Sequence, residues 1–223
     1  MYLVILLLPT LGTLFGSFFG RALGGRGTAL LTTSAVAATF VLSMIGLYEV
    51  GYAGAPCSLS LGHWVFAEAF DAEWGFLFDT LTMVMLCMIT GVSSLVHLYS
   101  IGYMSADPHL PRFMTYLSTF TIFMMLLGTG NTFLILFLGW EGVGLASYLL
   151  INFWFTRAQA NKASIKAMIM NRVGDVGLAL GIFGIYLLFK TIDYATVFST
   201  AHLHASDSFV FLGNDVHALT AIG

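Results

Sequence analysis

Six stretches of this sequence are apolar over roughly the 20 residues that a helix needs to cross a bilayer. In lipid, a backbone must satisfy its own polar groups, which leaves helices or closed barrels. No segment alternates between apolar and polar residues over about ten positions, as barrel strands do. We therefore predict an all-α integral membrane protein, a helical bundle without strands. The predicted spans are Tyr2–Phe19, Thr28–Tyr48, Phe76–Tyr99, Phe113–Gly130, Thr132–Phe155 and Ala167–Phe189, and a seventh helix is predicted to begin near Val216.

The composition agrees with a membrane protein. Charged residues make up 9% of the chain and hydrophobic residues 58%, whereas a soluble domain has about 25% charged residues. The net charge is −3 and the sequence contains no basic patch, so a nucleic-acid partner is not expected. The first residues, MYLVILLLPTLGTLF, lack the basic region of a signal peptide and are predicted to form the first span.

Lysine and arginine gather on one side of the predicted bundle if its helices alternate in direction. These residues are Arg21, Arg26, Arg112, Arg157, Lys162 and Lys166. The other side has Lys190 and an excess of acids, namely Glu49, Glu68, Asp71, Glu73, Asp193, Asp207 and Asp215. Because basic loops favour the inner side of a membrane, we expect the N-terminus on the outer side.

Glu141 is the one ionisable residue in the apolar run Thr132–Phe155. An acid at this depth costs roughly 2.5–3.5 kcal/mol on insertion scales, so its side chain should face protein or water. Gly142 and Ala146 form a small-xxx-small pair that lets another helix approach. One interpretation is a protonated glutamic acid with a single interhelical hydrogen bond. The other is a protonatable site on an ion path, loaded and unloaded by a movable cation.

A second polar cluster lies in KASIKAMIMNRVGDVGLALGIF. Arg172 and Asp175 are three residues apart and therefore lie on the same helical face. They can form a purely structural ion pair, or, together with Asn171 and Glu141 on the preceding helix, a polar track across the bundle. His97 lies near the inner end of its predicted helix. It can carry a proton near neutral pH, or it can be an interfacial histidine with satisfied hydrogen bonds.

No motif points to a cofactor or metal on this chain. The glycines of GWEGVG do not fit the dinucleotide pattern GxGxxG, and a CxxC series, a haem motif and a phosphate-binding loop are absent from the sequence. The pairs His202/His204 and Cys57/Cys87 offer too few ligands for a metal framework. We therefore expect that this chain carries out no redox chemistry itself.

Five motifs resemble one family of membrane proteins. FDTLTMVM, SSLVHLYSIGYM, DPHLPRFM, FLGWEGVGLASYLLINFWFTR and KAMIMNRVGD are similar to the chain 5 family of NADH:ubiquinone oxidoreductase, the antiporter-like membrane subunit of respiratory complex I. The resemblance implies proton translocation in the mitochondrial inner membrane, with the N-terminus on the intermembrane-space side. It also implies that NADH, FMN, iron–sulfur clusters and ubiquinone bind to other subunits of the complex.

The same resemblance assigns roles to individual residues. Glu141 matches the family's essential glutamate, Asp175 an acid that influences it, and Arg172 a neighbouring arginine. In the family, the glutamate pairs with a lysine on helix seven, within two inverted five-helix repeats that contain broken helices. We accordingly expect residues 1–112 to hold the first three helices, and residues 113–223 to begin an antiporter-like repeat.

The sequence differs from the family by ending at HALTAIG, where helix seven should begin. We hypothesise a split subunit, in which a second polypeptide supplies the pairing lysine and adjacent antiporter-like subunits are further partners. Cleavage of a longer chain, or a truncated sequence, would give the same ending. Two other functions stay open: a subunit of a multi-chain sodium/proton antiporter, and a structural remnant of the membrane arm that does not pump.

Overall fold

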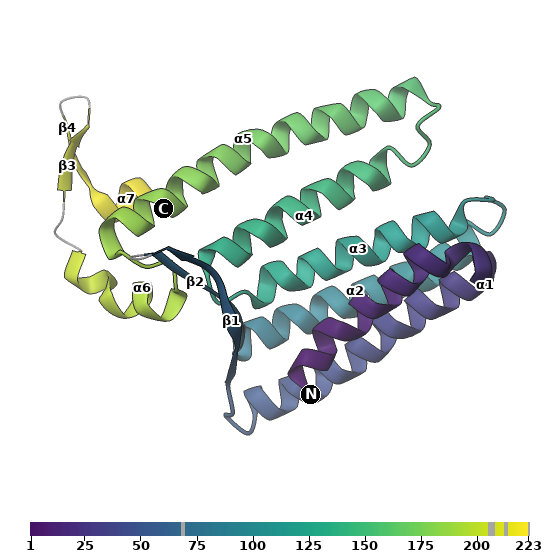
Figure 1. The fold of residues 1–223 in the computed structure, drawn as a ribbon, viewed down its shortest axis with the longest axis horizontal. Helices are drawn as coiled ribbons and strands as arrows, with labels where there is room; N and C mark the ends of the chain where they lie inside the picture. Colours follow the sequence, from purple (N-terminus) through teal and green to yellow (C-terminus); the bar gives the residue numbers. More distant parts are fainter. Residues whose placement is uncertain (68–69, 205–207, 212–213, 223) are drawn as a thin grey trace.

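The computed structural model describes residues 1–67, 70–204, 208–211 and 214–222, and its long helices run side by side in one bundle (Figure 1). The long helices are α1 (Tyr2–Gly51), α2 (Thr80–Tyr103), α3 (Leu110–Thr129), α4 (Phe133–Ile151) and α5 (Ala158–Phe189). The short ones are α6 (Tyr194–Thr200), the 3-10 helix η1 (Ala201–His204) and α7 (Ala218–Ile222). α1 packs against α2 and α3, and the bundle then continues from α3 to α4 and from α4 to α5.

Among the described residues, six helical segments are long and apolar enough to cross a membrane, which confirms the predicted number of spans. Two of them belong to α1, which is broken at Gly24 (φ 70°, ψ 176°), where a positive φ favours glycine. The halves of α1, Tyr2–Gly20 and Ala22–Gly51, fold back on each other (Figure 1). The turn of α1 and the starts of α3 and α5 lie at one end of the bundle, and the starts of α2 and α4 lie at the other (Figure 1).

The predicted grouping of charges follows from this alternation of helices. The predicted basic loops belong to the end with the turn of α1, and the acidic loops to the end with the starts of α2 and α4. Of the acids named for that second end, Glu68 and Asp207 lie outside the described residues. The division of the chain at residue 112 stays a prediction.

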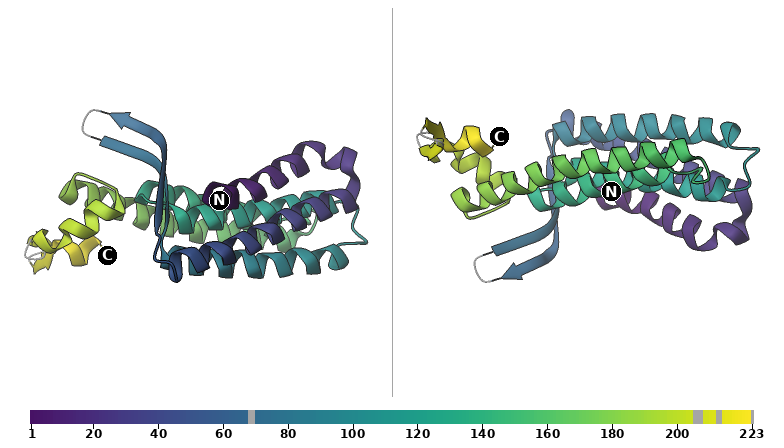
Figure 2. Two further views of the ribbon diagram at one scale, coloured as in Figure 1. Left: turned by 90° about the horizontal axis from the view of Figure 1, so that it is seen from below. Right: turned by 90° about the horizontal axis from the view of Figure 1, so that it is seen from above.

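The helical bundle is confirmed, but two short antiparallel strand pairs that the sequence did not indicate lie in the connections between helices. β1 (Cys57–Ala67) pairs antiparallel with β2 (Phe70–Phe78), and the hairpin extends away from the helices (Figure 2). β2 is the more buried strand, with Ala72, Phe76 and Phe78 enclosed. A second antiparallel pair joins β3 (Ser208–Phe211) to β4 (Asn214–His217). A search for membrane spans misses such strands because they lie outside the apolar runs.

This hairpin also moves one predicted helix boundary. α2 begins at Thr80 and not at Phe76, because Phe76 and Phe78 are paired in β2. Asp79 then caps the helix, since its carboxylate accepts a hydrogen bond from the backbone N–H of Thr82 at 2.7 Å. An acid at this position also interacts favourably with the helix dipole.

Other helix boundaries also differ from the prediction. α5 begins at Ala158 and not at Ala167, so Lys162 and Lys166 lie on this helix and not in a loop. The predicted seventh helix corresponds to α7, which begins at Ala218. Val216, its predicted start, is paired in β4.

Small residues allow the helices of the bundle to approach one another closely. A Cβ atom at Gly12 would lie 2.9 Å from the Cβ of Ala35, within the fold of α1. A Cβ at Gly139 of α4 would lie 2.6 Å from the Cα of Leu127 in α3, and a Cβ at Gly142 would overlap the ring of Phe123. The backbones of α3 and α4 are therefore in direct contact at these glycines.

We predict that Gly139→Ala destabilises the contact between α3 and α4. The added methyl group would meet the backbone of Leu127, which cannot move aside, so we expect a loss of about 1–3 kcal/mol in the free energy of unfolding. The thermal unfolding midpoint of the chain in detergent measures this loss. Gly177→Ala is the matched control, because a Cβ there has no atom within 4 Å and replacing a helical glycine by alanine is favourable. An equal midpoint for the two variants would contradict the prediction.

Candidate functional site

Glu141 is the ninth residue of α4 and lies at the depth of the membrane-spanning segments. Gly139, Gly142 and Ala146 are buried on the face of α4 that contacts α3. This packing fixes the rotation of α4 about its axis, so that the Glu141 side chain points toward α5. The Glu141 side chain is partly covered, with 29% of its surface exposed.

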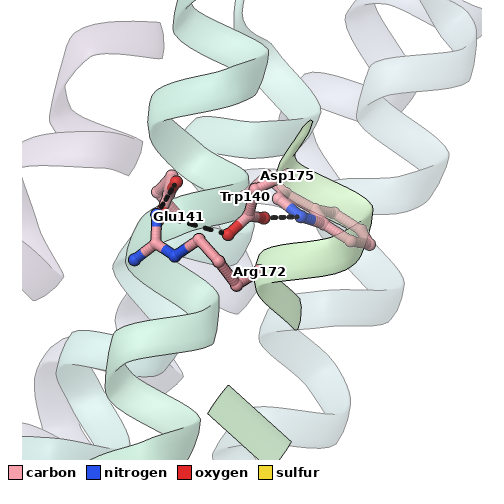
Figure 3. A network of polar contacts seen from close by, with 4 residues as sticks. All are labelled: Trp140, Glu141, Arg172 and Asp175. Carbon is pink, nitrogen blue, oxygen red and sulfur yellow. Dashed lines mark hydrogen bonds and ion pairs between the residues drawn. The ribbon is translucent and has the colours of Figure 1, made fainter. Parts of the chain in front are cut away.

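Four side chains from α4 and α5 form one polar network in this region (Figure 3). Arg172 Nη1 donates a hydrogen bond to Glu141 Oε1 at 3.0 Å, and the same nitrogen lies 3.6 Å from Asp175 Oδ2. Trp140 Nε1 donates a hydrogen bond to the other oxygen of Asp175, Oδ1, at 2.9 Å. Arg172 thus lies between two carboxylates, of which one is also held by an indole.

The two carboxylates differ in their surroundings. The side chain of Asp175 has 7% of its surface exposed, whereas Arg172 has 56% exposed. Asp175 is therefore fixed inside the contact between α4 and α5, and Arg172 reaches Glu141 from the rim. An arginine is protonated at all relevant pH values, so any proton that this network gains or loses belongs to a carboxylate.

The prediction of an ion pair between Arg172 and Asp175 on one helical face is confirmed. The predicted polar track is present to the extent that Arg172 also pairs with Glu141 of the neighbouring helix. Asn171 of α5 also lies against α4, beside Gly144. If Gly144 had a Cβ atom, the side-chain nitrogen of Asn171 would be 2.9 Å from it. In the part of the chain that the structure describes, the ion-pair partner of Glu141 is this arginine and not a lysine.

Trp140 is a member of the network that was not expected from the sequence. A tryptophan in the middle of an apolar run, away from the membrane interface where this residue is enriched, was the available signal. Trp140 is 42% exposed in this chain, yet its indole N–H is aimed at a hydrogen-bond partner on the next helix. Asp175 is that partner, and the pairing depends on how α4 and α5 face each other, which the sequence pattern alone does not give.

His97 lies in a different part of the bundle. It is fully buried between α2 and α3, six residues before the end of α2. The helix continues to Tyr103, which moves His97 away from the helix end. Its Nδ1 lies 2.8 Å from the carbonyl oxygen of Ser93, and its Nε2 lies 3.0 Å from Ser118 Oγ. The contact with Ser118 joins α2 to α3, and neither contact reaches the network of Glu141.

Comparisons with known proteins point to one family. Residues 64–114 match the family model described as NADH-ubiquinone oxidoreductase (complex I), chain 5 N-terminus, and residues 129–214 match the one described as NADH:quinone oxidoreductase/Mrp antiporter, TM. The curated NADH-ubiquinone oxidoreductase chain 5 of Triticum aestivum is 58% identical over the whole chain, and that of Marchantia polymorpha is 56% identical. The chain spans 33% and 34% of the length of these two relatives.

The fold also has a solved counterpart. A chain in the structure of the membrane-bound sulfane sulfur reductase, an archaeal respiratory membrane complex, superimposes with a TM-score of 0.73 at 16% sequence identity. The match covers 90% of this chain and 39% of that one, and at this identity it supports the fold alone. Together with the six apolar helices, the sequence relatives show a multi-pass membrane protein that belongs to the NADH-ubiquinone oxidoreductase chain 5 family.

Proposed function

We propose that this chain is part of the proton-translocating membrane arm of respiratory complex I, and that Glu141, Arg172 and Asp175 form part of its proton path. The observation that supports this most directly is the position of Arg172 between two carboxylates at membrane depth. Ionisable residues inside a membrane mark ion paths by default. The redox cofactors NADH, FMN, iron–sulfur clusters and ubiquinone would bind to other subunits.

The geometry suggests how such a site works. A nearby cation favours the ionised form of a carboxyl group, and burial in a low dielectric favours the neutral form. Arg172 Nη1 is 3.0 Å from Glu141 and 3.6 Å from Asp175, so a small rotation changes which acid it stabilises. Glu141 would hold a proton when Arg172 moves toward Asp175, and release it when Arg172 returns.

The surroundings of Arg172 favour a further partner. The Arg172 side chain is 56% exposed in this chain, at a depth where lipid is a poor neighbour for a charge. Protein or water must therefore cover it in the membrane. We propose that another polypeptide segment covers this side of α5 and brings the lysine that the family resemblance implies. We place the assembly in the mitochondrial inner membrane, with the N-terminus in the intermembrane space.

A sodium/proton antiporter subunit is the second candidate, because the family model matched by residues 129–214 includes Mrp antiporters. The two functions differ in their driving reaction. Proton movement driven by NADH oxidation and unaffected by sodium favours complex I. Proton movement that requires a sodium gradient and no NADH favours the antiporter.

We predict that Glu141→Gln blocks proton transfer while the complex still assembles. Glutamine keeps the size of the side chain but cannot take up a proton, so we expect proton flux through this path to fall about 100-fold, as for a lost acid–base group. Proton uptake per NADH oxidised in liposomes containing the purified complex measures this. Glu49→Gln is the matched control, because Glu49 accepts a hydrogen bond from Tyr2 in this chain and lies outside the network. Normal pumping by Glu141→Gln would remove Glu141 from the path and favour a structural role.

We predict that Trp140→Phe also lowers proton flux, through Asp175. The lost hydrogen bond to a charged group contributes roughly 1.5–3 kcal/mol, so we expect a loss of about tenfold. Trp154→Phe removes an indole hydrogen bond to Asp107, outside the network, and should leave flux unchanged. In the Glu141→Gln background, Trp140→Phe should add nothing, since both changes act on one network. Additive losses in the double variant would show that Trp140 acts independently of Glu141.

A further inference from the structure

The β1–β2 hairpin carries a cluster of side chains that the proposed proton path does not use. The hairpin projects from the helices at the end where α2 and α4 begin (Figures 1 and 2). His63 lies on β1, and Asp71 and Glu73 lie on β2. One ligand atom from each of these three residues lies within 4.8 Å of the other two.

The irregular register of the hairpin brings these residues together. Strand pairing is shifted between Ser60 and His63 and again between His63 and Val65, so that His63 pairs with Glu73. Gly62 has a φ of +125°, a conformation that favours glycine. Such bulges change the direction of a side chain and often occur beside functional sites. Asp71 and Glu73 are two residues apart on β2 and therefore share one face.

The hydrogen bonds within the cluster orient its acids. His63 Nδ1 lies 2.7 Å from Asp71 Oδ1. Ser60 Oγ donates a hydrogen bond to Glu73 Oε2 at 2.9 Å. Partners of this second kind hold metal-binding carboxylates in place and raise metal affinity. Zn–N and Zn–O bonds of about 2.0–2.2 Å place tetrahedral ligand atoms roughly 3.4 Å apart. The ligand atoms of the cluster lie within 4.8 Å of one another, so small side-chain rotations would bring them to the distances that a zinc ion requires.

The cluster is open to solution. The side chains of His63 and Asp71 are 58% and 43% exposed. Asp71 and Glu73 also line a polar hollow of about 340 Å³, together with Thr132, Thr191, Asp193 and Thr196. These residues belong to the start of α4 and to the segment around the start of α6. A cation can therefore enter from solvent beside a third carboxylate, that of Asp193.

We propose that His63, Asp71 and Glu73 form a binding site for a divalent transition-metal ion, with Zn²⁺ as the probe. One imidazole nitrogen and two carboxylate oxygens suit zinc and similar ions, and water would complete the coordination. A bound ion would join the two strands of the hairpin. It would also restrain β2 against the start of α4, the helix that contains Glu141.

The test is isothermal titration of ZnCl₂ into the full chain in detergent, with unchanged helical circular dichroism as the check of folding. We expect one Zn²⁺ ion per chain, and a loss of affinity of roughly tenfold or more in His63→Gln and in Glu73→Gln. Ser60→Ala should give a smaller loss at the same stoichiometry, because Ser60 only positions Glu73. His202→Gln, which changes an exposed histidine elsewhere, is the matched control and should bind as the unchanged chain does.

The absorption spectrum of the Co²⁺-loaded chain gives a second readout. Nitrogen and oxygen ligation of a four- or five-coordinate ion gives visible bands, which should disappear in His63→Gln and persist in His202→Gln. The proposal is overturned if the unchanged chain binds no Zn²⁺. It is also overturned if His63→Gln and Glu73→Gln bind Zn²⁺ as tightly as the unchanged chain.

Discussion

A guanidinium group at membrane depth requires anionic partners, and this requirement governs the contact between α4 and α5. Arg172 meets it with two carboxylates, Glu141 and Asp175, at 3.0 and 3.6 Å. Removing charges from water is costly, and only close pairing with further hydrogen bonds offsets that cost. Trp140 supplies such a bond to Asp175. Loss of Arg172 would therefore leave the buried carboxylate of Asp175 without its ion-pair partner.

The position of this set depends on helix packing several ångströms away. The side chains of adjacent helical residues point about 100° apart. Trp140 and Glu141 can therefore both contact α5 only if α4 is rotated so that α5 lies between the directions of these two side chains. The glycines on the opposite face of α4 fix that rotation by contact with α3. On α5, Arg172 and Asp175 lie one turn apart and meet these two residues in reverse order. The apolar packing of α4 against α3 thus determines where the charged side chains between α4 and α5 lie.

Sequence reasoning is strong where a single helix decides the outcome. The number of spans follows from apolar length, and the Arg172–Asp175 pair follows from a three-residue spacing. It is weak where two elements must be placed relative to each other. The bonds Trp140–Asp175 and Arg172–Glu141 cross between helices, and the register that joins His63 to Glu73 depends on bulges that no periodicity indicates.

Counting charges indicates what the proposed site exchanges. With both acids ionised, Glu141, Arg172 and Asp175 sum to a net charge of −1, which is unfavourable in a low dielectric. One added proton makes the set neutral, and in the proposed function Glu141 carries it while Arg172 pairs with Asp175. A second cation beside Glu141, such as the lysine of a covering segment, would neutralise the set equally well and expel the proton. In the proposed function, one proton would be loaded and released as that cation withdraws and approaches.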